Sequence, residues 1–316
     1  MAVHSTRGQG MMTQEEKDYL WPALPFEAWK KTYDTLHMWT QVVGKVKLEL
    51  CPFLNQWWEV GFYVTAEGLT TGLIPSLTGA FQVTFDFIHH NLFIFTSDGR
   101  RKDMPLMPCS VADFYSYFMT ALNALGIEVK INTKPSEVEH GVPFEQDTSH
   151  SAYDPEHVNR WWRILVQTEN VLQQYRSRFI GKSSPVLFYW GTFDLAEARY
   201  SGKRVSPPPG ANRILRVAEN QEQVCCGFWP GEGKLQNPAF YSYTYPKPSG
   251  IENVSLRPGA AHYDNSMGEF ILLYEDVRKA ASPAQTLLEF FQSTYEAGAT
   301  LAHWNRQELE QQPPDL

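Results

Sequence analysis

Apolar side chains recur at helical spacing in several long segments of the chain. In the first of these, Trp29, Tyr33, Leu36 and Val43 fall on one stripe of a helix that starts near Pro25. A glycine is the residue that most often follows a helix, so Gly44 predicts the end of this one. The helix therefore has one buried face and spans about five turns.

Shorter apolar runs predict strands after this helix, at residues 46–50, 57–65, 81–87 and 92–96. A second amphipathic helix starts at Ser110, where Asp113 three residues later forms a weak capping box, and it ends at Gly126. The alternating segment 127–131 predicts one more strand.

The second half of the chain repeats this order of elements. A long helix is expected from the N-cap Asp154 and Pro155 to Gly181. Strands are expected at 186–190, 223–229, 240–245 and 269–274, and a final helix runs from Ser282 to about Trp304.

The shared order predicts an α+β fold built as two pseudo-repeated α-β4-α halves, with antiparallel sheets covered by helices. We expect a loose tail over residues 1–20, a first half over 21–135, a connector over 136–156 and a second half over 157–316. In this hypothesis the segments after Gly44-Lys45 and Gly181-Lys182 form equivalent strands. Because sequence identity between the halves is slight, a chance similarity of order is the alternative.

The stretch "SPVLFYWGTFDLAEARYSGKR" (184–204) places an apolar wall directly before three charged residues. If the strand continues, Glu197 and Arg199 share one face with apolar neighbours. If a helical turn follows, Asp194 is its N-cap and Glu197 its third residue. Both geometries carry Asp194, Glu197 and Arg199 from a buried wall to a rim. The alternative to a binding site is a local cap with a salt bridge.

The aromatic composition of the chain also predicts a ligand cavity. Aromatic residues make up 14% of the chain, with 10 Trp, 15 Tyr and 19 Phe. Such side chains bury large areas, and Tyr and Trp also carry a polar group that needs a partner. We therefore expect an aromatic-lined cleft where the two halves meet, because ligand sites commonly lie between such units.

The formal net charge of −8 argues against a nucleic-acid partner, since phosphate neutralisation needs a basic surface. The sequence has no long uncharged apolar run and no signal peptide, which argues against a membrane span and against secretion. Four cysteines without ligand spacing indicate reduced thiols. Together these features predict a cytoplasmic protein.

No nucleotide-binding or nucleophile motif appears, so the cofactor, the reaction and the oligomeric state stay unknown. His37, His90 and His150 lie in separate segments and none pairs with another His at helical spacing, so we expect no metal site.

The residues expected in the cleft divide into two groups. His37, Asp194 and Arg199 are candidate catalytic groups, for acid–base chemistry and for holding an anion. The candidate ligand-binding residues are Trp39, Trp58, Tyr189, Trp190, Trp229, Tyr243 and His262.

Three functions are compatible with these residues. The first is an enzyme that acts on a small polar or aromatic molecule, and the second is a non-catalytic protein that binds such a molecule. The third is a pseudo-symmetric saddle for nucleic acid, which the acidic balance opposes.

The chain also resembles a known family through "LHMWTQVVGK", "FDFIHH", "TSDGR", "SVADFY", "GFWPG", "FYSYTYP", "GEFILLYEDVR" and "LLEFFQSTYEA", which occur in that order. That family consists of uncharacterised, mostly bacterial proteins and is catalogued only as a domain of unknown function. The resemblance extends from Leu20 to Trp304. It implies one unit in a bacterial cytosol and transfers no activity or site residue.

Overall fold

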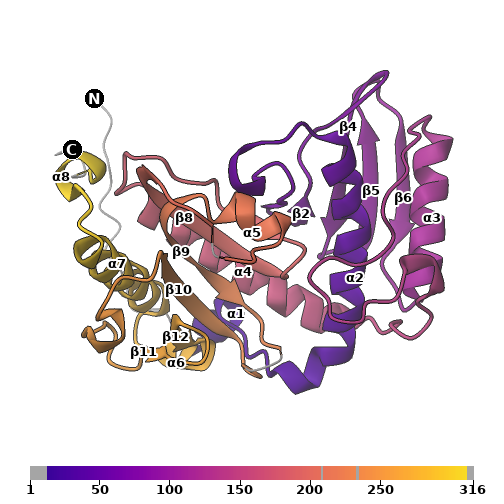
Figure 1. Cartoon of the computed structure of the whole chain (residues 1–316). Helices are drawn as coiled ribbons and strands as arrows, with labels where there is room; N and C mark the ends of the chain where they lie inside the picture. The colour runs from indigo at the N-terminus through magenta and orange to yellow at the C-terminus, as the bar shows by residue number, and fades with distance from the viewer. Residues whose placement is uncertain (1–12, 208, 233–234, 312–316) are drawn as a thin grey trace, which may run out of the picture.

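The computed structural model describes residues 13–207, 209–232 and 235–311, and it places one antiparallel sheet in each half of the chain (Figure 1). The first half contains α1 (Gln14–Leu20), α2 (Phe26–Leu50), η1 (Asn55–Trp57), β1 (Tyr63–Val64), β2 (Gly68–Thr70), β3 (Ile74–Ser76), β4 (Gly79–Asp86), β5 (Asn91–Thr96), β6 (Arg101–Pro105) and α3 (Val111–Ala124). After η2 (Phe144–Gln146), the second half contains α4 (Pro155–Arg176), β7 (Leu187–Tyr189), β8 (Asp194–Arg204), α5 (Arg213–Ala218), β9 (Gln221–Trp229), β10 (Ala239–Tyr245), η3 (Ile251–Asn253), β11 (His262–Asp264), β12 (Glu269–Leu273), α6 (Tyr274–Lys279), α7 (Pro283–Leu301) and α8 (Arg306–Leu309).

Both sheets have six strands in the described part of the chain. The first has the order β1-β2-β4-β5-β6 with β3 paired to β4, and the second has the order β11-β12-β10-β9-β8-β7. Helices α2 and α3 pack together in the first half, while α4 and α7 pack together against the second sheet. This arrangement confirms the predicted α+β class. No helix of the described residues is both long enough and apolar enough to cross a membrane.

Helix α2 is longer than the sequence predicts. It continues through Gly44 to Leu50, so the strand expected at 46–50 is wrong. The stripe of buried residues continues through Val46, and no turn residue follows Gly44 to stop the helix. Gly44 is a packing residue instead, because the ring of Trp190 occupies the space where its side chain would lie.

Other helix and strand boundaries also differ from those that the sequence predicts. Residues 127–131 pack against the core without strand pairing, and the strand expected at 57–65 shrinks to β1. In the segment expected to be a loose tail, α1 forms with a capping box at Thr13, and residues 1–12 lie outside the described residues. After Tyr189 the chain turns over residues 190–193 and returns as strand β8, antiparallel to β7, so the helical turn capped by Asp194 does not form.

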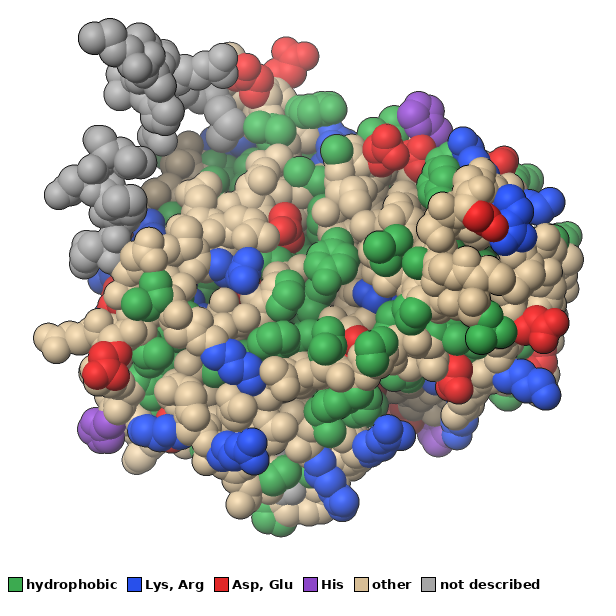
Figure 2. Space-filling model, turned by 90° about the horizontal axis from the view of Figure 1, so that it is seen from above, with side chains coloured by type: hydrophobic (Ala, Val, Ile, Leu, Met, Phe, Trp, Pro, Cys, Tyr) green, Lys and Arg blue, Asp and Glu red, His purple; other side chains and the backbone are tan. Residues whose placement is uncertain are grey.

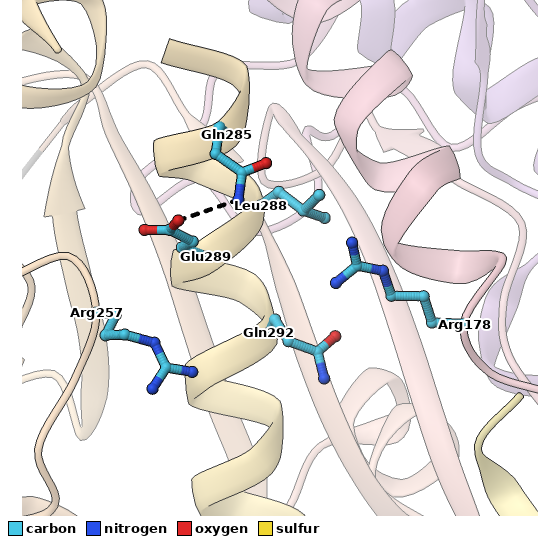
Figure 3. A pocket seen from close by; sticks show the side chains of 6 residues that line it. All are labelled: Arg178, Arg257, Gln285, Leu288, Glu289 and Gln292. Atoms are coloured by element: carbon cyan, nitrogen blue, oxygen red, sulfur yellow. Dashed lines mark hydrogen bonds between the residues drawn. The ribbon is translucent and has the colours of Figure 1, made fainter. Parts of the chain in front are cut away.

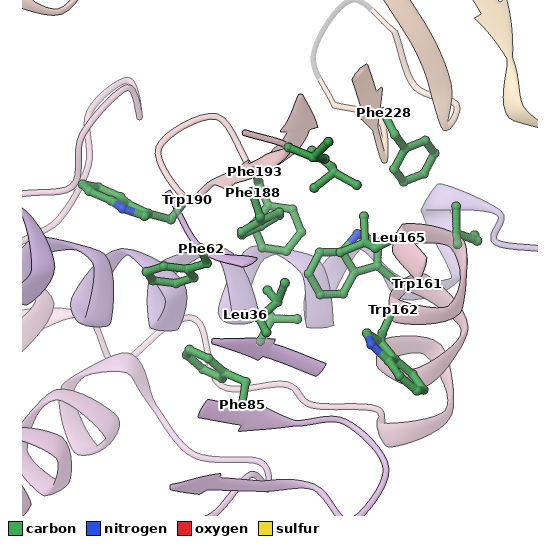
Figure 4. Close-up of a cluster of buried hydrophobic side chains, with 14 of the residues drawn as sticks. Leu36, Phe62, Phe85, Trp161, Trp162, Leu165, Phe188, Trp190, Phe193 and Phe228 are labelled. Atoms are coloured by element: carbon green, nitrogen blue, oxygen red, sulfur yellow. The ribbon is translucent and has the colours of Figure 1, made fainter. Parts of the chain in front are cut away.

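The two sheets meet at one residue pair. The backbone N–H of Phe62 donates to the carbonyl oxygen of Phe188 at 2.9 Å, and the N–H of Phe188 donates to the carbonyl of Phe62 at 2.8 Å. Rings from both halves pack around this pair (Figure 4). Phe193 stacks on Trp161 of α4, with ring centroids 4.8 Å apart, and meets Phe188 edge-on at 5.1 Å.

Phe193 adopts a left-handed backbone conformation, with φ near 59°. For a non-glycine residue this conformation costs on the order of 1–2 kcal/mol. The contacts of its fully buried ring in this cluster offset that cost.

The structure does not confirm the predicted repeat of the two halves. Each half contains a helix, a run of antiparallel strands that are neighbours in the sheet, and a further helix. The sequence markers are not equivalent, however, because Gly44-Lys45 lies inside α2 while Gly181-Lys182 lies in the loop after α4. The structure thus contradicts the expectation that both pairs precede equivalent strands, and the repeat itself stays a proposal.

Gly44→Ala tests whether the contact with the Trp190 ring requires a glycine at this position. Alanine normally favours a helix interior by about 1 kcal/mol. Its Cβ here would lie 2.3 Å from the Trp190 ring, so we expect the variant to lower the free energy of unfolding by roughly 1–3 kcal/mol in a chemical denaturation experiment. Gly259→Ala is the matched control, because no atom lies within 4 Å of the added Cβ, and it should change stability little. A stabilised Gly44→Ala protein would contradict this account of the helix.

Candidate functional site

Polar side chains from both halves line a hollow of about 250 Å³. We call it the inter-half groove, and it is lined by Asn55, Gln56, Arg204, Val205, Asn220 and Gln221. Asn55 and Gln56 belong to η1 of the first half. The other four come from the end of β8, the start of β9 and the residues next to them. The groove is therefore formed only when both halves are in place.

An unusual backbone holds the first-half side of the groove. Gln56 and Trp57 are consecutive non-glycine residues with positive φ, at 50° and 63°. Such conformations persist where surrounding contacts fix them, and they are frequent at functional sites. Here the indole N–H of Trp57 donates to the carbonyl oxygen of Ile214 in α5 at 3.1 Å. The amide of Gln56, which is only 6% exposed, donates to the side-chain oxygen of Asn220 at 2.6 Å.

Lys182 lies beneath this amide pair. Its Nζ donates to the side-chain oxygen of Gln56 at 2.9 Å and to that of Gln221 at 3.1 Å. The ammonium also lies 4.4 Å from the ring centroid of Tyr200 and 5.2 Å from that of Trp58. Burial, and secondarily the nearby charge of Arg204, lowers the pKa of Lys182. A partly buried cation thus joins the groove to the aromatic residues next to it.

These aromatic residues cover one face of the second sheet, the face opposite α4 and α7. Ala196, Ala198 and Cys225 form its small-residue centre, together with the ring of Tyr200. The rings of Trp58, Tyr189, Tyr241 and Tyr243 pack against that centre. We call this surface the tyrosine face. Three of the predicted ligand-binding residues, Trp58, Tyr189 and Tyr243, come together on it.

Asp194 lies at one end of the tyrosine face, opposite Tyr189 in the strand register. It is 8% exposed and accepts hydrogen bonds from the hydroxyls of Thr192 and Tyr241. Burial raises the pKa of Asp194, and the two hydroxyls counteract part of that effect. Burial also raises the pKa of Glu269 to about 7, with the charge of Asp194 contributing. This end of the face is acidic, whereas the groove end is basic.

The structure places Arg199 on the other face of β8, beneath α4 and α7. Its guanidinium lies 3.3 Å from the ring centroid of Tyr175 and 4.4 Å from that of Tyr295, and it donates to the carbonyl oxygen of Tyr175. Arg199 is completely buried, and its contacts with Tyr175 and Tyr295 are structural. Its catalytic role stays a prediction.

Glu197 shares the buried face with Arg199. Among the described residues, neither of its oxygens accepts a hydrogen bond, and its Oε1 lies 4.0 Å from Nε of Arg176. Burial raises the pKa of Glu197 to about 7, although the charges of Arg199 and Arg176 act in the opposite direction.

The other predicted site residues lie elsewhere. His37 is buried at the junction, where its Nε2 lies 3.0 Å from the carbonyl oxygen of Gly191, and burial lowers its pKa. Trp39 stacks on Phe114 in the core of the first half, and Trp190 packs on Gly44. Trp229 ends β9 half-buried, while His262 is exposed on β11. His37, Asp194 and Arg199 form no hydrogen bond with one another in the described structure.

A second hollow of about 300 Å³ lies on the outer side of α7 (Figure 3). Arg178 and Arg257 flank the helix, and the amide of Gln285 donates to Glu289 at 3.0 Å. No residue of the first half and no aromatic ring lines it, and Arg257 already forms an ion pair with Glu296 at 3.4 Å. It does not match the cleft that the sequence predicts.

No group of three or more His, Cys, Asp or Glu side chains in the described structure is arranged to hold a metal ion. On the molecular face in Figure 2, acidic and basic side chains are interspersed around a central group of hydrophobic ones. The absence of a nucleic-acid partner stays a prediction.

Sequence reasoning missed the polar residues of the groove. Lys182 and Arg204 stand out in the sequence only as parts of Gly-Lys and Gly-Lys-Arg turns, and Gln56, Asn220 and Gln221 match no motif. The one available signal was the concentration of amide side chains before β1 and before β9.

Comparison with known proteins places the chain in a family. Residues 21–311 match the model described as "Family of unknown function (DUF5996)", so the chain belongs to that family. This confirms the resemblance to a domain of unknown function. The comparisons found no similar curated protein and no similar solved structure.

Glu197 makes the stability of the protein depend on pH. Its pKa is about 7 in the folded state and near 4.5 in the unfolded chain, so folding takes up a proton between these values. The free energy of unfolding therefore falls as pH rises from 4.5 to 7, by roughly 3 kcal/mol, since a tenfold change in proton affinity corresponds to about 1.4 kcal/mol.

Glu197→Gln removes this contribution while other titrating groups, including Glu269, stay in both proteins. Denaturant unfolding at pH 5 and pH 8 should show that the variant gains stability relative to the natural protein as pH rises. An unchanged difference between the two proteins at both pH values would show that Glu197 stays ionised when folded.

Proposed function

We propose that this protein binds a small polar organic molecule in the inter-half groove. The observation that carries the proposal is that amide side chains of both halves converge on one hollow above a partly buried lysine. Ligand sites typically combine a concave surface with a few polar groups held by a rigid scaffold. As the sequence predicts, we propose the cytoplasm as the location.

The tyrosine face gives the groove an aromatic border. Trp58 and Tyr200 lie directly against Lys182, so the groove borders a surface of rings. The amides of the groove offer partners for the polar atoms of a ligand, next to the half-buried ring of Trp58. A volume of about 250 Å³ suits a molecule the size of a small metabolite.

Catalysis is the second candidate function that the sequence suggests, and it has less support. Asp194 and Arg199 lie on opposite faces of β8, and His37 contacts the backbone at Gly191. General acid–base catalysis needs such groups within hydrogen-bond reach of one reacting atom. We therefore favour binding without chemistry.

Val205→Phe tests the groove by filling it. Val205 is half-buried in the lining, so a phenyl ring fits outward and blocks the hollow without entering the core. Ligand-observed NMR with a defined library of small polar molecules should give binders for the natural protein, and the variant should lose them. Val142→Phe, at an exposed connector position, is the matched control and should keep them.

Melting temperatures of all three proteins check that they are folded. Binding that survives equally in Val205→Phe, or a library without any binder, would refute the proposed function.

A further inference from the structure

We infer that the inter-half groove recognises an anionic group, a carboxylate or a phosphate, on its ligand. This inference rests on the proposed function and adds the chemical class of the ligand. It follows from the direction of the hydrogen bonds around Lys182.

A lysine ammonium has three N–H donors and no acceptor. The amide oxygens of Gln56 and Gln221 must therefore be the atoms that face Lys182, at 2.9 and 3.1 Å. This resolves the usual ambiguity between the oxygen and nitrogen of a side-chain amide. With its oxygen directed to Lys182, Gln56 presents its NH₂ group to Asn220, which in turn must present its oxygen at 2.6 Å.

The lining groups left over are mainly donors. The oxygens of Gln56, Gln221 and Asn220 each already accept a hydrogen bond. The NH₂ groups of Asn220 and Gln221 have no partner in the described structure, and the guanidinium of Arg204 adds up to five N–H groups. Asn55 adds one amide oxygen and one NH₂ group to the lining, so a ligand in this groove meets more donors than acceptors.

Charge favours an anion over a neutral acceptor. Among the described residues, no carboxylate forms an ion pair with Lys182 or Arg204, and the nearby acid Glu222 lies 3.6 Å from Nζ of Lys203 instead. Burial, and after it the repulsion from Arg204, lowers the pKa of Lys182 and so disfavours its charged form. The negative charge of a carboxylate or phosphate in the groove offsets both effects by its attraction to the two cations, and it forms charge-assisted hydrogen bonds.

Titration calorimetry of the full chain at low ionic strength tests this directly. The probes are inorganic phosphate and succinate, with the neutral diamide of succinate as the uncharged comparison. We expect at least one anion to bind with one-to-one stoichiometry and the diamide to give no heat. Tighter binding of phosphate assigns a phosphate ligand, and tighter binding of succinate assigns a carboxylate. Equal binding of the diamide, or no binding of either anion, overturns the inference.

Single substitutions test whether the anion binds in the inter-half groove. Arg204→Gln and Lys182→Met should each weaken the anion at least about tenfold, the loss expected for one charge-assisted interaction. Lys203→Gln is the matched control, because Lys203 is an adjacent exposed cation outside the lining, and it should change affinity less than about twofold. Arg204 is exposed, so its variant keeps the test valid even if Lys182→Met fails to fold.

Equal weakening by Lys203→Gln would indicate a general attraction of the surface for anions and would overturn the assignment to the groove. If neutral molecules bind the natural protein and are lost in Val205→Phe while no anion binds, the proposed function holds and this inference alone fails.

Discussion

Two backbone hydrogen bonds between Phe62 and Phe188 join the two sheets, and the aromatic cluster at the junction is built around them. The pair brings the beginning of the first sheet next to the beginning of the second. Separate contacts fix the two sides of the groove, because the side chain of Gln56 in η1 bonds to Asn220 and to Lys182 of the second half. The rings of Phe193 and Trp161 exclude water from the bonds between Phe62 and Phe188, which strengthens them relative to bonds exposed to solvent.

Strand β8 separates two chemically different environments. One face carries Glu197 and Arg199 under the helices, where buried polar groups are costly unless they are paired. The other face carries Ala196 and Ala198 under rings, where the small side chains let Tyr189 and Tyr243 approach the strand. An alternation of this kind is normal for a strand covered on both faces, and a charged residue in it says nothing by itself about function. The groove differs because its charged and amide groups lie at the surface end of the strand, where a ligand has access to them.

The sequence predicted those elements whose signals are local. Helices α3, α4 and α7 follow from their amphipathic spacing and their caps, and the main strands follow from apolar runs between turn residues. The end of α2 was mispredicted because Gly44 is explained by Trp190, a contact between residues far apart in the chain. The same limit applies to the site. The aromatic composition placed Trp58, Tyr189 and Tyr243 among the candidates, and the structure brings them together. The pairing of Gln56 with Asn220 exists only after the halves have met.

A junction between distant residues also has a consequence during synthesis on the ribosome. At roughly 5–20 residues per second, Phe188 emerges on the order of ten seconds after Phe62. Until then the first sheet has an open inner edge at β1, beside the aromatic side chains that will later contact the second half. Its outer edge, β6, carries Arg101, Lys102 and Asp103, charges that discourage pairing with another chain. The nascent first half is therefore protected on its outer side only, and the inner side depends on the arrival of β7 to escape aggregation.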